Sequence, residues 1–204
     1  MPLDDAALPK ALSALPVPLD VEPMETKLAA ELPEEPGWAF EPKWDGFRCL
    51  AFKAGSDVAL LAKSGKRLTR YFPEMVAAVA ALPGDRFVLD GELTVPVDGL
   101  PSFEALQMRL HPAASRIAKL SAETPSKLVL FDALAIGEEV LTEAPLSERR
   151  AALERLAESW GANPSFGLSP VTHDRAEAQA WLDARAGGRD GVVAKRLDQP
   201  YRPG

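Results

Sequence analysis

The sequence predicts an α+β fold in which antiparallel β-sheets are flanked by helices. Segments of strand length are interleaved with amphipathic segments of helical length, without the regular rhythm of a doubly wound parallel sheet. Turn residues separate neighbouring strand segments, which favours antiparallel hairpins. The chain has 204 residues, of which 47% are hydrophobic, so it is long enough to bury one substantial core and we expect one domain.

Residues 1–23 are predicted to form an extended, proline-rich leader. Eight of the 19 prolines lie at or before Pro42. Proline fixes φ, lacks a backbone donor and disfavours helix in the residue before it. We therefore expect the leader to run over the surface without helix, and the compact domain to span residues 24–204.

The next elements are predicted to be a hairpin and a short helix. Apolar runs at Arg48–Lys53 and Val58–Lys63 are separated by a glycine-containing turn, which is typical of a β-hairpin. The lone cysteine, Cys49, lies in the first run and is expected to be a small buried apolar residue. A helix is expected from Pro73 to about Leu82, because proline suits the first helical position and Pro83-Gly84 ends the segment.

The segment Phe87–Val95 alternates with the period of a half-buried strand. One face is apolar, and the other face carries two carboxylates. The apolar face consists of Phe87, Leu89, Leu93 and Val95, and the opposite face consists of Val88, Asp90, Glu92 and Thr94.

The remaining elements are three helices and two strands. A buried strand is expected at Leu128–Ile136, because that run is apolar except for Asp132. The helices are expected at Ser102–Leu110, Ser147–Trp160 and Asp174–Ala186, the last ending at Gly187-Gly188. A turn at Asp190 then leads into a short final strand.

Composition limits the function classes. The net charge of −7 disfavours extensive phosphate binding, although Lys63, Lys66, Arg67 and Arg70 form a basic cluster, for which a solvated hairpin is the simpler interpretation. No run approaches the about 20 apolar residues of a membrane span, so we expect an intracellular protein without a membrane partner. The two histidines have no partners at metal-ligand spacing, so no zinc site is expected.

Acidic, amine and guanidinium groups are concentrated in Glu41-Pro42-Lys43-Trp44-Asp45-Gly46-Phe47-Arg48, just before a strand. A lysine in this setting could be a nucleophile, whereas most lysines in turns are surface residues. The run resembles the nucleotidyl-transfer motif of ATP-dependent DNA ligases, K-x-D-G-x-R, with an acidic residue two positions before the lysine.

The resemblance continues in order along the chain. It includes Phe87–Leu93, Leu130-Phe131-Asp132 and Asp190–Lys195, so it extends from about Met24 to the last residue. It is similar above all to bacterial ligases associated with break repair. The family implies a nucleotidyltransferase (ATP-grasp-like) fold and a bacterial cytoplasmic, nucleoid-associated location.

The resemblance implies a role for each matching residue. Lys43 would attack the α-phosphate of ATP and carry AMP as a covalent intermediate, which needs a neutral amine. The other roles are adenine recognition by Glu41, sugar–phosphate contact by Arg48, stacking on adenine by Phe131, nucleotide binding by Glu92 and Lys195, and binding of Mg²⁺ or Mn²⁺ by Glu92 and Asp190. Without the resemblance, the sequence fits Phe131 equally well as a core residue, and Glu92 and Asp190 equally well as solvated carboxylates.

The family normally continues into a two-lysine motif and an OB-fold domain, both of which follow a segment like Tyr201–Gly204. We therefore expect an isolated adenylation domain, impaired in self-adenylation, that binds nicked double-stranded DNA weakly and works with an OB-fold domain in a longer protein. Two alternatives remain: a catalytically silent nucleotide-binding module, and a nucleotidyltransferase of the RNA ligase or GTP-using capping type.

Overall fold

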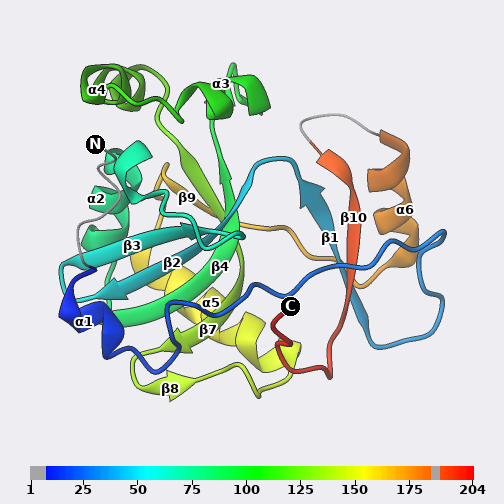
Figure 1. Ribbon diagram of the computed structural model, residues 1–204. Helices are drawn as coiled ribbons and strands as arrows, with labels where there is room; N and C mark the ends of the chain where they lie inside the picture. Colours follow the sequence, from blue (N-terminus) through cyan, green and yellow to red (C-terminus); the bar gives the residue numbers. More distant parts are fainter. Residues whose placement is uncertain (1–7, 185–188) are drawn as a thin grey trace.

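Three β-sheets with helices packed around them make up the computed structural model, which describes residues 8–184 and 189–204 (Figure 1). The larger sheet has the strand order β3-β2-β4-β7-β8, and β9 lies beside β7. Its strands are β2 (Phe47–Ala54), β3 (Asp57–Ala62), β4 (Arg86–Thr94), β7 (Lys127–Ile136), β8 (Glu139–Val140) and β9 (Phe166–Leu168). A two-stranded sheet pairs β1 (Trp38–Trp44) with β10 (Arg189–Arg196), and a small hairpin joins β5 (Pro96–Val97) to β6 (Leu100–Pro101).

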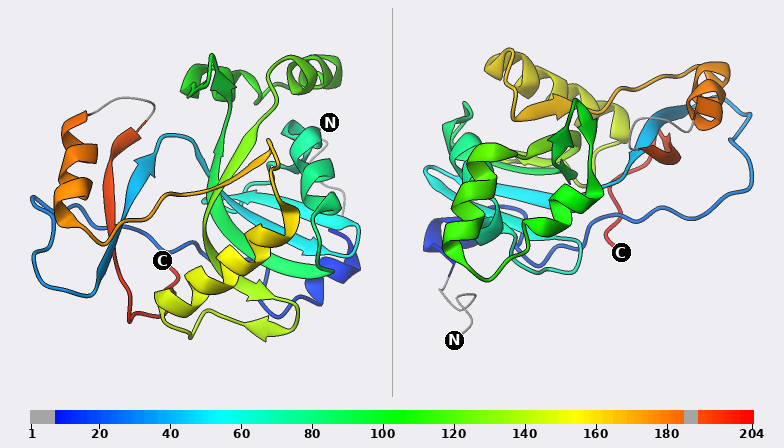
Figure 2. Two further views of the ribbon diagram at one scale, coloured as in Figure 1. Left: turned by 180° about the vertical axis from the view of Figure 1, so that it is seen from behind. Right: turned by 90° about the horizontal axis from the view of Figure 1, so that it is seen from above.

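The helices cover the sheets from several sides (Figure 2). They are α1 (Lys10–Ser13), the 3-10 turn η1 (Thr69–Tyr71), α2 (Pro73–Ala81), α3 (Phe103–Met108), α4 (Ala114–Glu123), α5 (Leu146–Trp160) and α6 (Arg175–Ala184). In the described part of the chain, no helix combines the length and the apolar character that crossing a membrane requires.

Local sequence signals explain many of these boundaries. Pro73 occupies the start of α2, and Ser102 caps α3 by accepting a 3.2 Å hydrogen bond from the backbone of Ala105. Asp174 accepts a 2.8 Å bond from the backbone of Ala176 at the start of α6. The predicted hairpin, the helices at residues 73–82 and 147–160, and the strand at 128–136 are all confirmed to within one or two residues.

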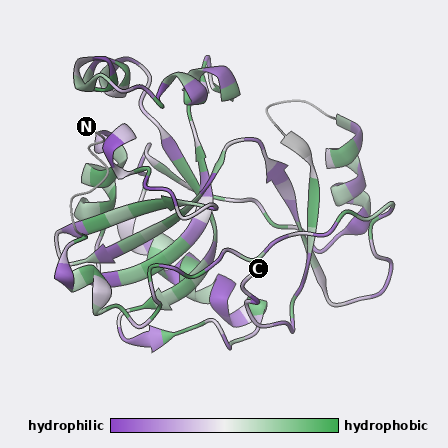
Figure 3. Cartoon of the chain, viewed as in Figure 1, coloured by the Kyte–Doolittle hydropathy of each residue, from purple (hydrophilic) through white to green (hydrophobic). Residues whose placement is uncertain are grey.

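The larger sheet is buried on both faces. One face packs against α2, α3 and α5 through Phe87, Leu89, Met75 and Leu153, among others. The alternation predicted for β4 is confirmed, because Phe87, Leu89, Leu93 and Val95 share this core while Val88 belongs to the opposite one. Figure 3 shows the apolar residues gathered along these strands.

The opposite face of the sheet is covered by the leader. Leu12, Leu15 and Val17 are buried against Leu50 and Phe52 of β2. The expectation of a leader without helix is therefore wrong at Lys10–Ser13, which form one helical turn between proline-containing segments. The compact structure also begins before Met24, because apolar side chains that lie among the prolines pack against this face of the sheet and bury it. Residues 1–7 lie outside the described residues.

Two further findings differ from the sequence prediction. The sheets are antiparallel as expected, except that β9 runs parallel to β7. Helix α4 was not predicted, because it follows a histidine–proline break and buries only Ile117 and Leu120. Residues 185 and 186, predicted to end the last helix, and Gly187-Gly188, predicted to stop it, lie outside the described residues.

Candidate nucleotide-binding site

Lys43 lies at the end of β1, beside an irregularity in the sheet. Strand β1 pairs antiparallel with β10, so that Glu41 is opposite Val193 and Lys43 is opposite Gly191. The register shifts between Lys43 and Trp44, which is where β1 leaves the ladder. Lys43 is exposed.

The turn after Lys43 packs closely against β4. A Cβ atom on Gly46 would lie 2.5 Å from the backbone oxygen of Leu93 and 2.9 Å from Cγ of Glu92. Only a residue without a side chain fits this approach. The glycine thereby brings the Lys43 turn and the Glu92 carboxyl together.

Glu41 and Lys195 form an ion pair across the small sheet. Lys195 Nζ donates a 2.8 Å hydrogen bond to Glu41 Oε1, and only 3% of the Glu41 side chain is exposed. The same ammonium lies 4.5 Å from the centroid of the Phe131 ring. Lys195 therefore contacts both Glu41, which is expected to read adenine, and Phe131, which is expected to stack on it.

Arg48 approaches the same aromatic ring from β2. Its guanidinium carbon is 4.6 Å from the Phe131 centroid, so two cations contact one ring. Arg48 also forms a bidentate pair with the fully buried Asp90, at 2.6 Å from Nε to Oδ1 and 2.7 Å from Nη2 to Oδ2. Burial acts to lower the pKa of Arg48, but the Asp90 carboxylate outweighs it and raises that pKa.

Glu92 lies among these charges and has an unusual acidity. Burial raises the pKa of Glu92 to about 7, and the Asp90 charge acts in the same direction. The charges of Arg48 and Lys43 oppose this rise. Burial favours the protonated form of this carboxyl. A bound cation would favour its ionised form instead.

The metal prediction for Glu92 and Asp190 depends on a side chain that the structure does not describe. Asp190 lies in β10, next to Gly191, but its side chain falls outside the described residues. Among the side chains that the structure describes, in residues 8–184 and 191–204, no group of three or more His, Cys, Asp or Glu is arranged to hold a metal. The chemistry of Glu92 fits a magnesium ligand, because Mg²⁺ prefers carboxylate oxygen and keeps several waters.

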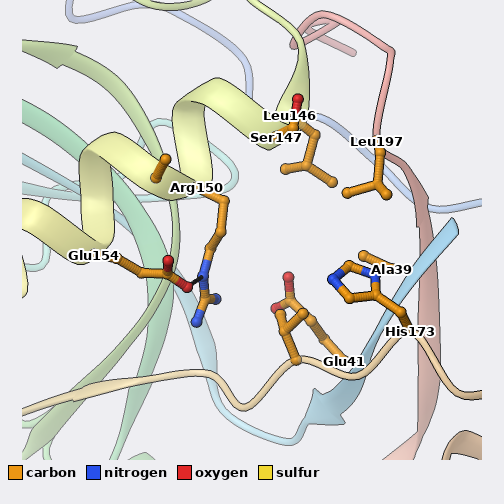
Figure 4. Close-up of a pocket in the computed structure, with 10 residues that line it drawn as sticks. Ala39, Glu41, Leu146, Ser147, Arg150, Glu154, His173 and Leu197 are labelled. Carbon is orange, nitrogen blue, oxygen red and sulfur yellow. Dashed lines mark hydrogen bonds and ion pairs between the residues drawn. The ribbon is translucent and has the colours of Figure 1, made fainter. Parts of the chain in front are cut away.

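A cavity of about 300 Å³ lies behind Glu41, between β1 and α5 (Figure 4). Glu41, Arg150 and His173 line it, whereas Lys43 and Phe131 do not. Arg150 donates a 2.7 Å bond to Glu154 and a 3.0 Å bond to the backbone oxygen of Ser169. The cavity therefore includes Glu41 but not Arg48 or Lys195.

The comparison with protein families gives this arrangement an identity. The family model described as "ATP dependent DNA ligase domain" matches residues 21–204. The chain belongs to this family. In this ligase domain, Arg48 and Lys195 both contact the Phe131 ring.

Named relatives agree with this membership. The ligase domain is 48% identical over 190 residues to DNA ligase C2 of Mycolicibacterium smegmatis, covering 93% of this chain and 52% of that protein. It is 44% identical over 192 residues to DNA ligase C of Mycobacterium tuberculosis, covering 93% of this chain and 53% of the relative. The chain thus spans about half the length of these relatives.

Solved structures show the same fold. The ligase domain matches a mycobacterial DNA ligase D complexed with ATP and MES, with a TM-score of 0.68 and 30% identity over 91% of this chain and 57% of that one. The ATP-dependent DNA ligase of bacteriophage T7, also in complex with ATP, has a TM-score of 0.58 and 18% identity, covering 82% of this chain and 59% of the other. The predicted nucleotidyltransferase fold is confirmed.

Two residues at the ligase site had no assigned role in the sequence analysis. Asp90 was noted only as sharing a strand face with Glu92, yet it holds the Arg48 guanidinium. Tyr201 donates a 2.6 Å hydrogen bond to Asp90, although the two residues are far apart in the sequence. Alternation in β4 could have pointed to Asp90, whereas no local signal connects Tyr201 to it.

Proposed function

We propose that this chain is the adenylation domain of an ATP-dependent DNA ligase and that Lys43 is its nucleophile. The neutral ε-amine attacks the α-phosphorus of ATP, the bond from that phosphorus to the bridging oxygen breaks, and pyrophosphate leaves. A phosphoramidate links Lys43 to AMP, and the amine loses a proton to solvent. This enzyme–AMP intermediate supplies the activated AMP for sealing nicks in DNA.

The observation that carries this proposal is that Lys195 contacts both Glu41 and the Phe131 ring, which Arg48 also contacts. Phe131 offers its ring to the adenine base, and Glu41 accepts from the adenine amino group. One Glu41 oxygen already accepts from Lys195, but a carboxylate has capacity for a further donor. Arg48 and Lys195 place positive charge beside the sugar and phosphates.

Exposure of Lys43 bears on its reactivity. The ammonium loses its proton more readily when water is displaced from around it, and bound nucleotide would supply that cover. Glu92 and Asp190 would hold Mg²⁺, which supplies charge neutralisation for the phosphates. Since the named relatives extend beyond the region matched here, we propose that an OB-fold domain of a longer protein works with this site.

Intact-mass measurement tests the nucleophile. The chain is incubated with ATP and Mg²⁺ beside a Lys43→Ala variant, and we expect a mass gain of one AMP in the unmodified chain alone. A gain in both proteins would overturn the assignment of Lys43. No gain in either, with ATP bound by titration calorimetry, would favour a catalytically silent nucleotide-binding module.

Two further measurements, of the nucleotide donor and of the nicked duplex, separate the related enzyme classes. We expect ATP, and not GTP, to donate the adduct, whereas GTP as the better donor would favour a capping-type nucleotidyltransferase. Nicked double-stranded DNA is the expected partner, bound weakly by this chain because its net charge is −7. Preference for a nicked RNA duplex would favour the RNA ligase alternative. The same result would contradict the proposed role in break repair in the bacterial nucleoid.

A further inference from the structure

Four residues close a ring of hydrogen bonds behind Phe131. The hydroxyl of Tyr201 donates to Asp90 Oδ2 at 2.6 Å and accepts from the backbone nitrogen of Met24 at 2.9 Å. Arg48 donates to both oxygens of Asp90, and its Nη2 also donates to the backbone oxygen of Met24 at 3.2 Å. The ring joins segments from the start, the middle and the end of the described chain.

The ring is buried, so each of its bonds matters. Asp90 has no exposed surface and Tyr201 is 3% exposed. A buried carboxylate needs its partners, because the cost of leaving one unpaired is high. Burial raises the pKa of Tyr201, which keeps the hydroxyl protonated and able to donate to Asp90. Tyr201 and Arg48 Nη2 therefore share one carboxylate oxygen in a fixed arrangement.

This arrangement determines where the Arg48 guanidinium lies. Two guanidinium nitrogens, Nε and Nη2, donate to Asp90 on one side. The guanidinium carbon lies 4.6 Å from the Phe131 centroid on the other side. If the hydroxyl of Tyr201 were absent, Asp90 Oδ2 would keep Arg48 Nη2 as a donor but lose Tyr201, and the carboxylate would be freer to rotate. The guanidinium would follow it, because the two groups are joined bidentately.

We propose that Tyr201 is a positioning residue of the nucleotide site, acting through Asp90 to hold Arg48 against Phe131. The inference rests on the proposed function, since Arg48 matters there through its contact with ATP. Tyr201 does not itself touch the nucleotide. Its contribution is to keep the Arg48 guanidinium in place before ATP arrives, which reduces the ordering that binding would otherwise require.

The test compares ATP affinities by titration calorimetry for the unmodified chain and Tyr201→Phe, which keeps the ring and removes only the hydroxyl. We expect Tyr201→Phe to bind ATP at least about threefold more weakly, because only part of the strength of this hydrogen bond to a charged group is felt in binding. Tyr71→Phe is the matched control, because it removes the hydroxyl of the chain's other tyrosine, and its affinity should be unchanged.

A double-mutant cycle separates positioning from general stability. Combined with Arg48→Lys, Tyr201→Phe should weaken ATP binding by less than it does alone, because its effect passes through the guanidinium. Full additivity would overturn the positioning role, and so would an unchanged affinity in Tyr201→Phe. A Tyr201→Phe chain that no longer folds at the temperature of the titration would also overturn it, in favour of a purely structural role.

The proposed function fails in a different way. If the unmodified chain bound no ATP, both the function and this inference would be overturned. If the unmodified chain bound ATP and Tyr201→Phe bound it equally well, only the inference would fall.

Discussion

Lys195 and Glu41 are diagonal neighbours on one face of the small sheet, and their side chains are joined at 2.8 Å. Lys195 is opposite Ala39 in the ladder, and Glu41 is opposite Val193. The carboxylate expected to read adenine is thus already paired with a cation in the ligand-free chain. This ion pair gives the buried Glu41 side chain a partner of opposite charge.

Lys195→Met should therefore destabilise the chain by leaving a buried charge. We expect a loss of about 2 kcal/mol in the free energy of unfolding, less than for a fully buried pair because Lys195 is partly exposed. Urea denaturation followed by circular dichroism gives this value. The double variant Glu41→Gln with Lys195→Met should be more stable than Lys195→Met alone, and the opposite order would contradict this account.

Arg149 should be more important for stability than any exposed arginine. It forms a bidentate pair with Asp132 at 2.8 and 2.9 Å, and both side chains are buried. Arg149→Met should cost about 3–5 kcal/mol in the free energy of unfolding, because Asp132 would lose its buried partner. Arg86→Met, which breaks an exposed pair with Glu138, should cost less than about 1 kcal/mol. Equal losses in the two variants would refute the prediction.

Gly46→Ala should impair nucleotide chemistry beyond its effect on stability. The added Cβ would meet the backbone of Leu93, so the turn that follows Lys43 must move. We expect a stability loss of about 1–3 kcal/mol from overpacking, with much slower AMP transfer to Lys43. The control is Gly137→Ala, which is strained by a φ of 62° but has open space and lies in another turn. It should lose stability without slowing the transfer.

Glu92 should make the stability of the chain depend on pH. Its pKa is raised from 4.5 to about 7 in the folded chain, so the folded state holds the proton more tightly than the unfolded state between these values. The stabilisation is present below pH 4.5 and is lost as the pH rises through about 7. Glu92→Gln stays neutral and should gain about 1–2 kcal/mol relative to the unmodified chain across this window, after allowance for partial exposure.

This dependence is measured by urea denaturation of both proteins at several pH values without nucleotide or metal. A stability difference that stays constant from pH 4.5 to pH 7 would show that Glu92 does not titrate in this window.

Cys49 should be unreactive until the chain unfolds. It has no exposed surface, and burial raises the pKa of its thiol, so the nucleophilic thiolate is scarce. We expect alkylation by iodoacetamide to be more than about 100-fold slower in buffer than in denaturing urea, because reaction needs local or global opening. Rapid labelling of the native chain, followed by mass spectrometry, would show that this part of β2 is accessible.

Local signals in the sequence predicted the elements that begin and end with strong turn or capping residues. Pro73 and Pro83 delimit α2, and the alternation from Phe87 to Val95 gave the two faces of β4 correctly. The turn of helix at Lys10–Ser13 was missed because proline dominated the expectation, while burial of Leu12 against the sheet outweighs local propensity.

The site was predictable where one motif carries several residues, and not where distant segments meet. Glu41, Lys43 and Arg48 come from a single run, and the resemblance to a family added Glu92, Phe131 and Lys195. The pairing of Arg149 with Asp132, and of Tyr201 with Asp90, depends on tertiary packing that no spacing encodes.

The pairing of β1 with β10 also has a consequence for the order of events during synthesis. The strand that carries Lys43 leaves the ribosome early, but its hydrogen-bonding partner is Arg189–Arg196. Contacts between such distant segments form late, because a long loop must close first. A nascent chain can fold its hairpin β2–β3 while Lys43 still lacks its neighbours. The reaction with ATP that we propose for Lys43 should therefore become possible only after Arg189–Arg196 has been made.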